Sequence, residues 1–488
     1  MSTLRKVLFL VFTAVYLVAA PLTILYALGY IFNPDEQKLL QTGLVSLVSD
    51  PSGAEVWVDG KLSRDKTPVV FRNLSPGTHE TRVTLPGHHP WQEQVKVVPE
   101  RALRFENILL FPETFVPEIL GNFPVSRLWH VPGGKYIFVL QGKTTSGLSL
   151  FDPSEKKFKP LVSLDLFPDS ELTELLIHPE GNQALLLQRK DSAPPLLIRL
   201  TEPPETLPHS HLLSPLLEEV RWDRRHNRLL FYLQGESLKK VDLEDLRLSL
   251  PLMDGVAGYT IHRGKFYVLD RQGRFLALNA KGKLEEVFLD DPAKARLVFG
   301  AGAQQKYRIF FLPNPSVFSP PYETAVLFLS SEGRLSSNKL PYFLDEGAAE
   351  LVPAFSHPRA AYRKGPELWV VDFDREEEKT FFETGPTPRR VHKGSDALSN
   401  LLWTFNDQYL IFLEGNRVMA QDFEGGGKAV ELFRVSREAP EIVLDSQSGF
   451  LYFAEPAQNR LARVKLHAPP GLIPRLMDDF VEITKDSP

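Results

Sequence analysis

The sequence contains no cysteine among its 488 residues. This absence excludes disulfide bonds, cysteine nucleophiles and thiolate metal sites, and it leaves the redox compartment undetermined. The sequence also lacks a Lys/Arg-rich block. Of its 56 basic residues, Arg5 and Lys6 precede a long apolar run, which leaves 54 basic against 61 acidic residues in the remainder. Nucleic acid is therefore not expected as a partner.

Linear catalytic signatures are missing as well. We find neither a Gly-x-Ser-x-Gly elbow nor a His-Glu-x-x-His pair, which serine hydrolases and zinc peptidases would show. The Gly-Lys-Thr at 142–144 is not a phosphate-binding loop, because Ile137 stands where its first glycine must be. We therefore predict no catalytic residue, no cofactor and no metal, and a protein that is not an enzyme.

One long hydrophobic run is present, at the N-terminus. Residues 7–32 carry no charge, and about 20 apolar residues suffice for a helix to cross a bilayer. Arg5 and Lys6 precede the run while Asp35 and Glu36 follow it, so the positive-inside bias predicts a cytoplasmic stub at 1–6 and an extracytoplasmic remainder. The alternative is a cleaved signal peptide, but the run exceeds the usual ~7–15 residues of its apolar core. We expect a single-pass anchor in the cell membrane.

The rest of the chain favours an all-β fold. Its 40 prolines and 31 glycines are scattered along the sequence, which is typical of many short strands joined by turns. After a linker at 33–42, a first domain is predicted at 43–111. In "EVWVDGK" (55–61), Val56 and Val58 share one strand face while Trp57 and Asp59 share the other, and Asp-Gly is a hairpin signal.

This first domain resembles the PEGA domain family, a small extracytoplasmic β-sandwich named after a Pro-Glu-Gly-Ala turn. The resemblance rests on "PSGA" at 51–54, "VWVDGK" at 56–61, Thr67-Pro68, "NLSPGTH" at 73–79 and "GHHPW" at 87–91. Ser52 replaces the family's glutamate, and His88 stands where an aromatic residue is usual. The resemblance implies a non-catalytic spacer or cell-envelope interaction module. His88 and His89 are not expected to share a metal, because adjacent strand residues point to opposite faces.

Residues 112–468 contain a repeat with a period of roughly 38 to 55 residues, which is the range of four-stranded propeller blades. In each unit a polar turn is followed by an apolar strand. The units are "WHVPGGKYIFVL" (129–140), "IHPEGNQALLL" (177–187), "WDRRHNRLLFYL" (222–233), "IHRGKFYVL" (261–269), "GAQQKYRIFFL" (302–312), "FSHPRAAYR" (355–363), "TFNDQYLIFL" (404–413) and "DSQSGFLYFA" (445–454). We predict a β-propeller of eight blades, with seven as the alternative.

The last unit lacks an outer strand, because the chain breaks at Pro469-Pro470-Gly471. Residues 113–120 lie just ahead of the first unit and can supply that strand, which would close the ring. The units resemble WD40-like and TolB-like propellers, although the repeated Gly-His and Trp-Asp pairs of WD40 repeats are missing. This resemblance implies a fold and no particular activity. The tail at 469–488 has near-helical apolar spacing and can form a short amphipathic helix.

One segment does not follow from the repeat. The fifth unit carries a Pro-rich excursion at 312–324, in which Phe318 and Tyr322 are candidate binding residues. The alternative is a loop that folds over its own blade or onto the first domain. Other polar runs are not expected to be binding sites. The acidic run 372–378 lacks the glycine of a calcium loop, His178-Pro179 and His357-Pro358 share one repeat position, and the basic group 389–393 is expected to be solvated surface.

Together these features predict a membrane-anchored, extracytoplasmic binding or scaffold protein of the cell envelope. The loops of the propeller would engage another envelope protein or a cell-wall or surface polymer. The alternative function is an extracytoplasmic hydrolase or lyase acting on glycan or peptide, since propellers can bring acid and base residues together from separate blades.

Overall fold

The chain folds into two compact units, Met1–Thr114 with Gly426–Lys428, and Phe115–Gly425 with Ala429–Pro488. They are called unit 1 and unit 2. The computed structural model describes residues 3–27, 30–33, 38–99, 101–131, 136–142, 147–163, 173–188, 195–201, 203–208, 218–223, 226, 228–243, 251–262, 265–272, 274–289, 307–311, 326–330, 342–343, 348–354, 357, 359–372, 388–404, 406–423, 427–445 and 448–466.

Unit 1 begins with the helix α1 (Thr3–Ala27), which contains Pro21. Across the described residues, the structure has no helix that combines the length and the apolar character required for crossing a membrane. The predicted membrane span at 7–32 is therefore not confirmed. After α1, the short strands β1 (Tyr30–Asn33) and β2 (Lys38–Gln41) pair with each other.

Two sheets packed face to face make up the rest of unit 1. The first has the order β6-β3-β9 and the second the order β5-β4-β7-β8. Val45, Val56 and Val83 are almost completely buried between them, and Trp91 meets Phe105 edge-on across the sheets at a ring distance of 5.5 Å. The strands are β3 (Gly43–Asp50), β4 (Glu55–Val58), β5 (Lys61–Leu62), β6 (Val69–Leu74), β7 (Gly77–Thr84), β8 (Trp91–Val97) and β9 (Ala102–Leu109).

Local turn chemistry explains this sandwich. Val58 pairs with Lys61 across a two-residue turn, and both turn residues have positive φ, 49° at Asp59 and 74° at Gly60. Positive φ at both positions is what Asp-Gly supplies in a tight hairpin. The "PSGA" segment is held by the backbone bonds Gly53 N to Thr67 O, 2.8 Å, and Thr67 N to Ala54 O, 2.9 Å. The segment is structural, as expected.

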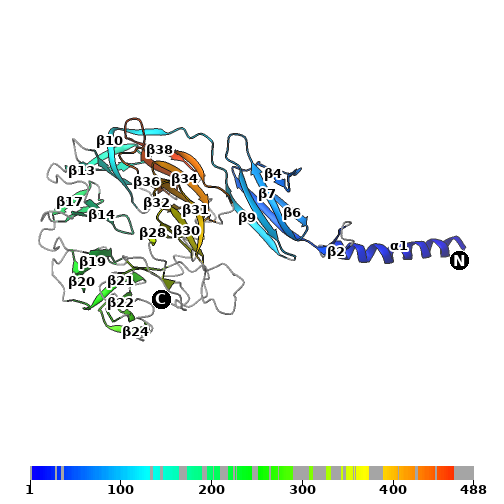
Figure 1. Cartoon of the computed structure of the whole chain (residues 1–488), viewed down its shortest axis with the longest axis horizontal. Helices are drawn as coiled ribbons and strands as arrows, with labels where there is room; N and C mark the ends of the chain where they lie inside the picture. Colours follow the sequence, from blue (N-terminus) through cyan, green and yellow to red (C-terminus); the bar gives the residue numbers. More distant parts are fainter. Residues whose placement is uncertain are drawn as a thin grey trace. The chain divides into compact units, whose positions relative to one another are not determined.

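Unit 2 consists of consecutive sheets that follow one another round an arc (Figure 1). Within these sheets, neighbouring strands are antiparallel except β26 and β27, which pair in parallel. Sheets of four strands are formed by β14–β17, β21–β24, β28–β31 and β32–β35, and sheets of three by β18–β20 and β25–β27. Their strands are β14 (Thr173–Ile177), β15 (Gln183–Gln188), β16 (Leu196–Arg199), β17 (Glu205–Pro208), β18 (Glu218–Trp222), β19 (Leu229–Gln234), β20 (Ser237–Asp242), β21 (Val256–His262), β22 (Lys265–Asp270), β23 (Phe275–Leu278), β24 (Leu284–Leu289), β25 (Tyr307–Phe311), β26 (Val326–Ser330), β27 (Tyr342–Phe343), β28 (Ala348–Pro353), β29 (Arg359–Lys364), β30 (Glu367–Asp372), β31 (Arg389–Lys393), β32 (Leu398–Trp403), β33 (Tyr409–Glu414), β34 (Arg417–Asp422) and β35 (Val430–Arg434).

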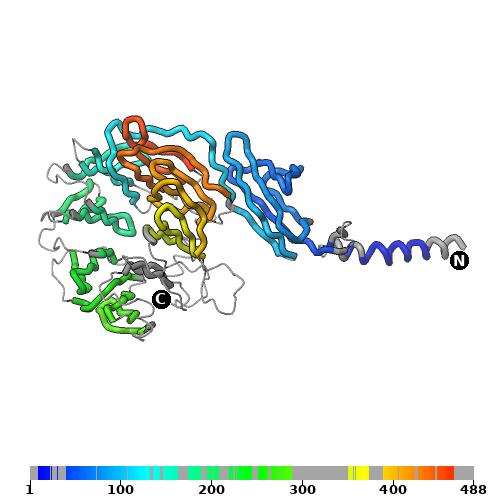
Figure 2. The backbone as a smooth tube through the Cα atoms, in the orientation of Figure 1, coloured from blue at the N-terminus to red at the C-terminus, as the bar shows by residue number. Residues whose placement is uncertain are grey.

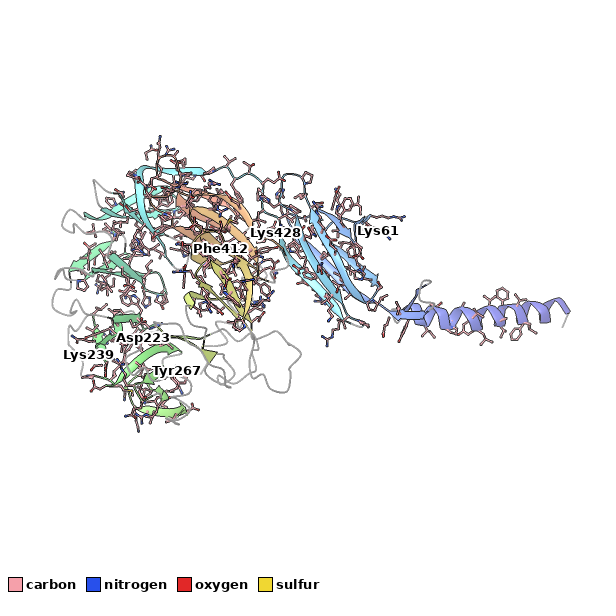
Figure 3. The ribbon with its side chains drawn as sticks, viewed as in Figure 1. Lys61, Asp223, Lys239, Tyr267, Phe412 and Lys428 are labelled. Carbon is pink, nitrogen blue, oxygen red and sulfur yellow. The ribbon has the colours of Figure 1, made fainter. Side chains whose placement is uncertain are left out.

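Hydrophobic clusters fill the spaces between neighbouring sheets. One cluster joins Leu185 of β15 to Tyr232 of β19. The next joins Phe231 of β19 to Phe266 of β22. A third joins Val370 of β30 to Phe412 of β33, which is labelled in Figure 3. Such strands pack on both faces, which explains why β11 (Ile137–Gln141) and β33 are continuous apolar runs in the sequence rather than alternating ones. Sheets that each pack on the next are the blades of a β-propeller.

A seven-stranded sheet joins the two ends of unit 2 in the order β13-β12-β11-β10-β38-β37-β36. The strand β10, drawn in cyan, runs beside β38, drawn in orange to red (Figure 2). Its first half pairs Glu118 with Arg463 and Ile119 with Ala462, and its second half, Val125 to His130, pairs with β11. The strands are β10 (Glu118–His130), β11 (Ile137–Gln141), β12 (Gly147–Asp152), β13 (Lys157–Ser163), β36 (Ile442–Asp445), β37 (Phe450–Ala454) and β38 (Arg460–Lys465).

The prediction that the segment ahead of the first repeat unit supplies an outer strand to the last repeat unit is confirmed, but this strand begins at Glu118 rather than at residue 113. The all-β expectation holds for the described residues apart from α1. The number of blades and the helical tail at 469–488 remain predictions, and the tail lies outside the described residues.

Candidate functional site

The two candidate binding residues, Phe318 and Tyr322, lie outside the described residues, as does most of the acidic run. Its first member, Asp372, is described and forms an ion pair with Arg359 at 3.3 Å. Arg359 itself is 9% exposed and lies over the ring of Phe423, 4.0 Å from its centre. Asp372 therefore helps to hold one blade against the next. No group of three or more metal-ligating side chains occurs among the described residues.

The histidines of the repeat link neighbouring blades. His178 is fully buried, accepts a hydrogen bond from Glu180 N at Nδ1, and bonds through Nε2 to the carbonyl oxygen of Asp223 in the next blade, each at 3.1 Å. His357 likewise reaches the buried carboxylate of Asp407 in the next blade at 3.1 Å. Both lie in turns at the same position of the repeat, as the sequence indicated.

The basic group at 389–393 is not a free cationic surface. Arg390 contacts Glu367 at 2.7 Å and Lys393 contacts it at 3.8 Å. Arg389 donates to the carbonyl oxygen of Phe423 at 2.7 Å. His392 bonds to Glu414 at 3.1 Å. Each basic side chain of this group therefore has an acceptor on its own blade or on the next. The side chains of Arg390 and Lys393 remain 49% and 64% exposed, so the group is solvated surface, as the sequence predicted.

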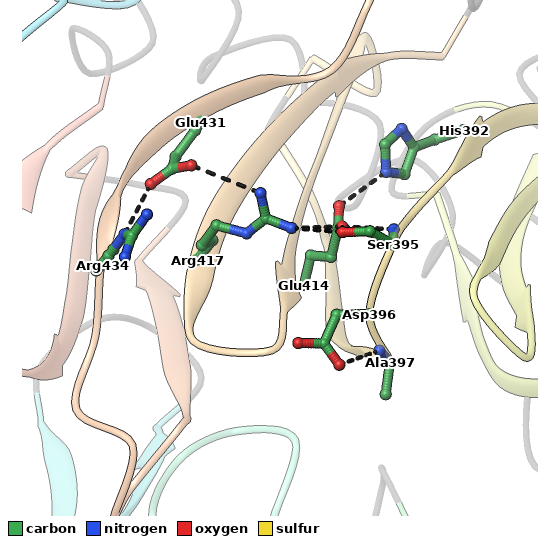
Figure 4. Close-up of polar contacts among 8 residues, drawn as sticks. All are labelled: His392, Ser395, Asp396, Ala397, Glu414, Arg417, Glu431 and Arg434. Carbon is green, nitrogen blue, oxygen red and sulfur yellow. Dashed lines mark hydrogen bonds and ion pairs between the residues drawn. The ribbon is translucent and has the colours of Figure 1, made fainter.

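A polar cluster surrounds Glu414, at the connection from β31 to β32 and the hairpin from β33 to β34 (Figure 4). Its Oε1 accepts hydrogen bonds from Ser395 N at 2.7 Å, Ser395 Oγ at 2.9 Å and Arg417 at 2.6 Å. Its Oε2 faces His392 Nε2 at 3.1 Å. Glu431 contacts Arg417 at 3.8 Å and Arg434 at 3.0 Å, and so extends the network outward.

The cluster contains a serine, a histidine and a carboxylate, but not in catalytic order. Nucleophilic serine needs the imidazole between its hydroxyl and the carboxylate, so that the imidazole takes the hydroxyl proton. Here the carboxylate of Glu414 lies between Ser395 and His392, and the Ser395 hydroxyl donates to that carboxylate. The arrangement supplies no base to Ser395 and does not support nucleophilic catalysis.

The backbone packs closely around the acidic side chains of this cluster. A Cβ at Gly394 would lie 2.9 Å from Glu414 Cδ, and one at Gly415, where φ is +62°, would lie 2.6 Å from Asp396 Oδ2. Burial raises the pKa of the Glu414 carboxyl, but the bonds from Ser395, His392 and Arg417 outweigh it and hold the pKa below its ordinary value. Glu414 is thus a charged side chain whose hydrogen bonds join two neighbouring blades.

A second set of hydrogen bonds, which the sequence did not predict, joins the first strands of neighbouring blades. Glu350 in β28 accepts a hydrogen bond from Leu401 N in β32 at 2.8 Å, and Asn400 in β32 accepts one from Ile442 N in β36 at 3.3 Å. Glu350 and Asn400 have φ of 49° and 53° and lie at β-bulges, where an extra residue turns the side chain toward the neighbouring blade. Glu441 makes the equivalent bond across the ring closure, to Leu128 N at 2.9 Å.

Unit 1 also contains an acid–imidazole pair. His79 Nδ1 lies 2.6 Å from Asp59 Oδ2, its Nε2 lies 2.8 Å from the Ser75 carbonyl oxygen, and Asp59 Oδ1 accepts from Glu80 N at 3.0 Å. Burial lowers the pKa of the His79 imidazole, but its bonds to Asp59 and Ser75 raise it overall. The pair fixes the Asp-Gly hairpin against β7.

A family model of the PEGA domain matches residues 42–109, which confirms the resemblance seen in the sequence. No curated protein shows a significant match. Among solved structures, PorZ, an essential bacterial surface component of the type-IX secretion system of Porphyromonas gingivalis, is 12% identical over 72% of this chain with a TM-score of 0.38. This chain covers 39% of that PorZ chain. The Cps50 (Swd1) β-propeller domain of Myceliophteria thermophila is 8% identical to this chain, with a TM-score of 0.39. The match covers 72% of this chain and 99% of the Swd1 chain.

Proposed function

We propose that this PEGA-domain and propeller protein is a membrane-anchored, extracytoplasmic binding or scaffold protein of the cell envelope. The ring displays loops that engage another envelope protein or a surface polymer. The observation that carries the proposal is that polar side chains of the ring form hydrogen bonds to neighbouring blades. In the described residues, the clusters around Glu414, Asp407 and Glu441 are closed by bonds between blades, which suits a rigid display scaffold.

The anchor is proposed from the N-terminal sequence. Residues 7–32 carry no charge, and the apolar side chains of Phe9, Leu10 and Phe12 on α1 are 73%, 71% and 67% exposed. A helix that presents such side chains outward gains most free energy in hydrocarbon. With Arg5 and Lys6 ahead of it, the positive-inside bias places residues 1–6 in the cytoplasm and the two units outside.

For the ring we infer eight blades. The repeat has eight units, and β36–β38 together with the first half of β10 form the last of them. The order of pairing supports this number, since β10 serves one blade with each half. A ring closed in this way has no open sheet edge at the junction.

The partner site is proposed at the excursion 312–324, with Phe318 and Tyr322 as anchors. The test is to capture partners from intact membranes with the full chain as bait and to repeat the capture with Phe318→Ala/Tyr322→Ala. Leu284→Ala, on the exposed edge strand β24, is the matched control. A stoichiometric partner that is lost only from the double variant supports the proposal. Equal capture by all three chains refutes this site, and turnover of glycan or peptide by the purified chain would instead support an enzyme.

A further inference from the structure

The outer face of the second sheet of unit 1 carries side chains that the sandwich core does not use. Along β4, Val56 is fully buried while Trp57 faces outward. Leu62 of β5 pairs with Trp57 on one side and is 52% exposed, and Arg82 of β7 pairs with it on the other. Trp57 is half-buried, and no hydrogen bond to its indole N–H is present in the described part of the chain.

Polar side chains continue this face across the next strand. Gln92 of β8 lies opposite Arg82, and Gln94 lies opposite Glu80. All four are exposed, and Gln92 donates to Glu80. The face is therefore an aromatic ring with a leucine on one side and amide, guanidinium and carboxylate groups on the other. Neighbouring strands lie ~4.8 Å apart, so β5 to β8 present a surface about 14 Å wide.

We propose that this outer face binds a carbohydrate chain. A pyranose ring with equatorial hydroxyls has an apolar C–H face, which can lie on the exposed part of the Trp57 indole beside Leu62. Its hydroxyls then point sideways, where Gln94 and Arg82 can donate and Glu80 can accept. Hydrogen bonds from fixed polar side chains around one apolar contact are the usual basis of specificity in a ligand site.

The composition of the face disfavours other occupants. A protein partner would need a desolvated centre with several apolar anchors, and here Trp57 and Leu62 are surrounded by polar groups. A nucleic acid would need a basic surface, but the carboxylates of Glu55 and Glu80 lie among the cations of Arg82 and Lys96. A neutral polysaccharide matches a flat, mixed-charge face with one aromatic ring.

This inference is independent of the loops of the propeller, because it concerns unit 1 alone. Its failure would leave the proposed function untouched, and loss of partner capture at 312–324 would leave this face untouched. A positive result would give the protein a second contact, by which the module nearest the N-terminus holds an envelope glycan.

The test titrates the purified full chain with chitohexaose, a β-linked oligomer of N-acetylglucosamine, and with cellohexaose, by calorimetry and by tryptophan fluorescence. We expect one of the two to bind and Trp57→Ala to weaken binding at least about tenfold, with Trp57→Phe retaining part of the affinity. Gln94→Ala should weaken binding a few-fold, because it removes hydrogen bonds and leaves the stacking contact in place.

The control is Val70→Ala, which removes a side chain that is 48% exposed on β6 of the other sheet and should leave binding unchanged. Circular dichroism of each variant establishes that unit 1 is folded, and Trp57→Phe preserves an aromatic ring if Trp57→Ala does not fold. Failure of the wild-type chain to bind either oligosaccharide at millimolar concentration overturns the proposal. Equal affinity of Trp57→Ala and the wild-type chain does so too.

Discussion

Replacing Glu441 by alanine should loosen the closure of the ring. Glu441 Oε2 accepts the hydrogen bond of Leu128 N at 2.9 Å, and its Oε1 accepts from Arg127 Nε at 3.0 Å. The two partners lie in β10, more than 300 residues away in sequence. The carboxylate therefore joins the last blade to the first, and few other side-chain bonds span this junction in the described residues.

The expected loss can be worked from these contacts. Leu128 is 5% exposed, so its N–H loses its acceptor with little access to water, which costs about 1–3 kcal/mol. The ion pair with Arg127 adds less than about 1 kcal/mol, because the two side chains are 35% and 25% exposed and solvent screens them. A total of about 2 kcal/mol lowers the melting temperature of a unit of this size by about 3 °C.

The assay is thermal unfolding of the full chain followed by circular dichroism, with Glu441→Ala, Glu441→Gln and Glu438→Ala compared at one pH. Glu441→Gln keeps an oxygen for Leu128 N and should lose only about 1 kcal/mol. Glu438 is exposed and its replacement should change nothing. If Glu441→Ala melts within half a degree or so of Glu438→Ala, the closure does not depend on this carboxylate and the reasoning is wrong.

Three further predictions concern other parts of the two units. Cysteines placed at Ile119 and Ala462, which face each other across β10 and β38, should form a disulfide on mild oxidation, detected as a mobility shift on a gel. The pair of His79 and Asp59 should stabilise unit 1 most between about pH 4 and 6.5, since the pKa of His79 is raised above 6.5 and that of Asp59 is lowered below 3.8. Its contribution is lost as pH rises through the folded pKa of His79 or falls through that of Asp59, and thermal unfolding of wild type and His79→Ala from pH 4 to 9 measures it. Glu414→Gln should cost about 2 kcal/mol in urea unfolding, because a buried charged acceptor is replaced by an amide.

Each of these has a matched control. The chain has no cysteine of its own, so a second pair at Val443 and Tyr452, neighbours within one blade, reports whether oxidation was sufficient. Oxidation of this pair but not of the pair across the junction would contradict ring closure. A pH profile that is the same with and without His79 would contradict the second prediction. Glu431→Gln, at a side chain that is 38% exposed, should cost well under 1 kcal/mol, and an equal cost for Glu414→Gln would contradict the third.

Local chemistry made several elements predictable. The turn at Asp59-Gly60 follows from a dipeptide that accepts positive φ at both positions. A closing strand could be predicted at 113–120 because the last repeat unit lacked an outer strand and an apolar segment preceded the first, although the strand itself begins at Glu118. In both cases a periodic pattern and its interruption carried the information.

The bonds between blades could not be predicted in the same way. Glu350 and Asn400 accept hydrogen bonds from strands about fifty and forty residues away, and their side chains reach those strands only because bulges give them left-handed φ. Glutamate at such a position leaves no motif. Trp57 could be predicted only in part. Alternation placed it on the strand face opposite Val56, but it did not indicate the polar side chains that neighbouring strands bring beside it.

The display of the two units outside the membrane is the claim on which the proposed function depends. It is tested by single cysteines introduced at Ser2 and at Leu284, which is 51% exposed on β24, followed by labelling of intact cells with a membrane-impermeant maleimide. The account predicts that Leu284→Cys is labelled in intact cells, whereas Ser2→Cys is labelled only after lysis. Labelling of Leu284→Cys only after lysis would contradict it.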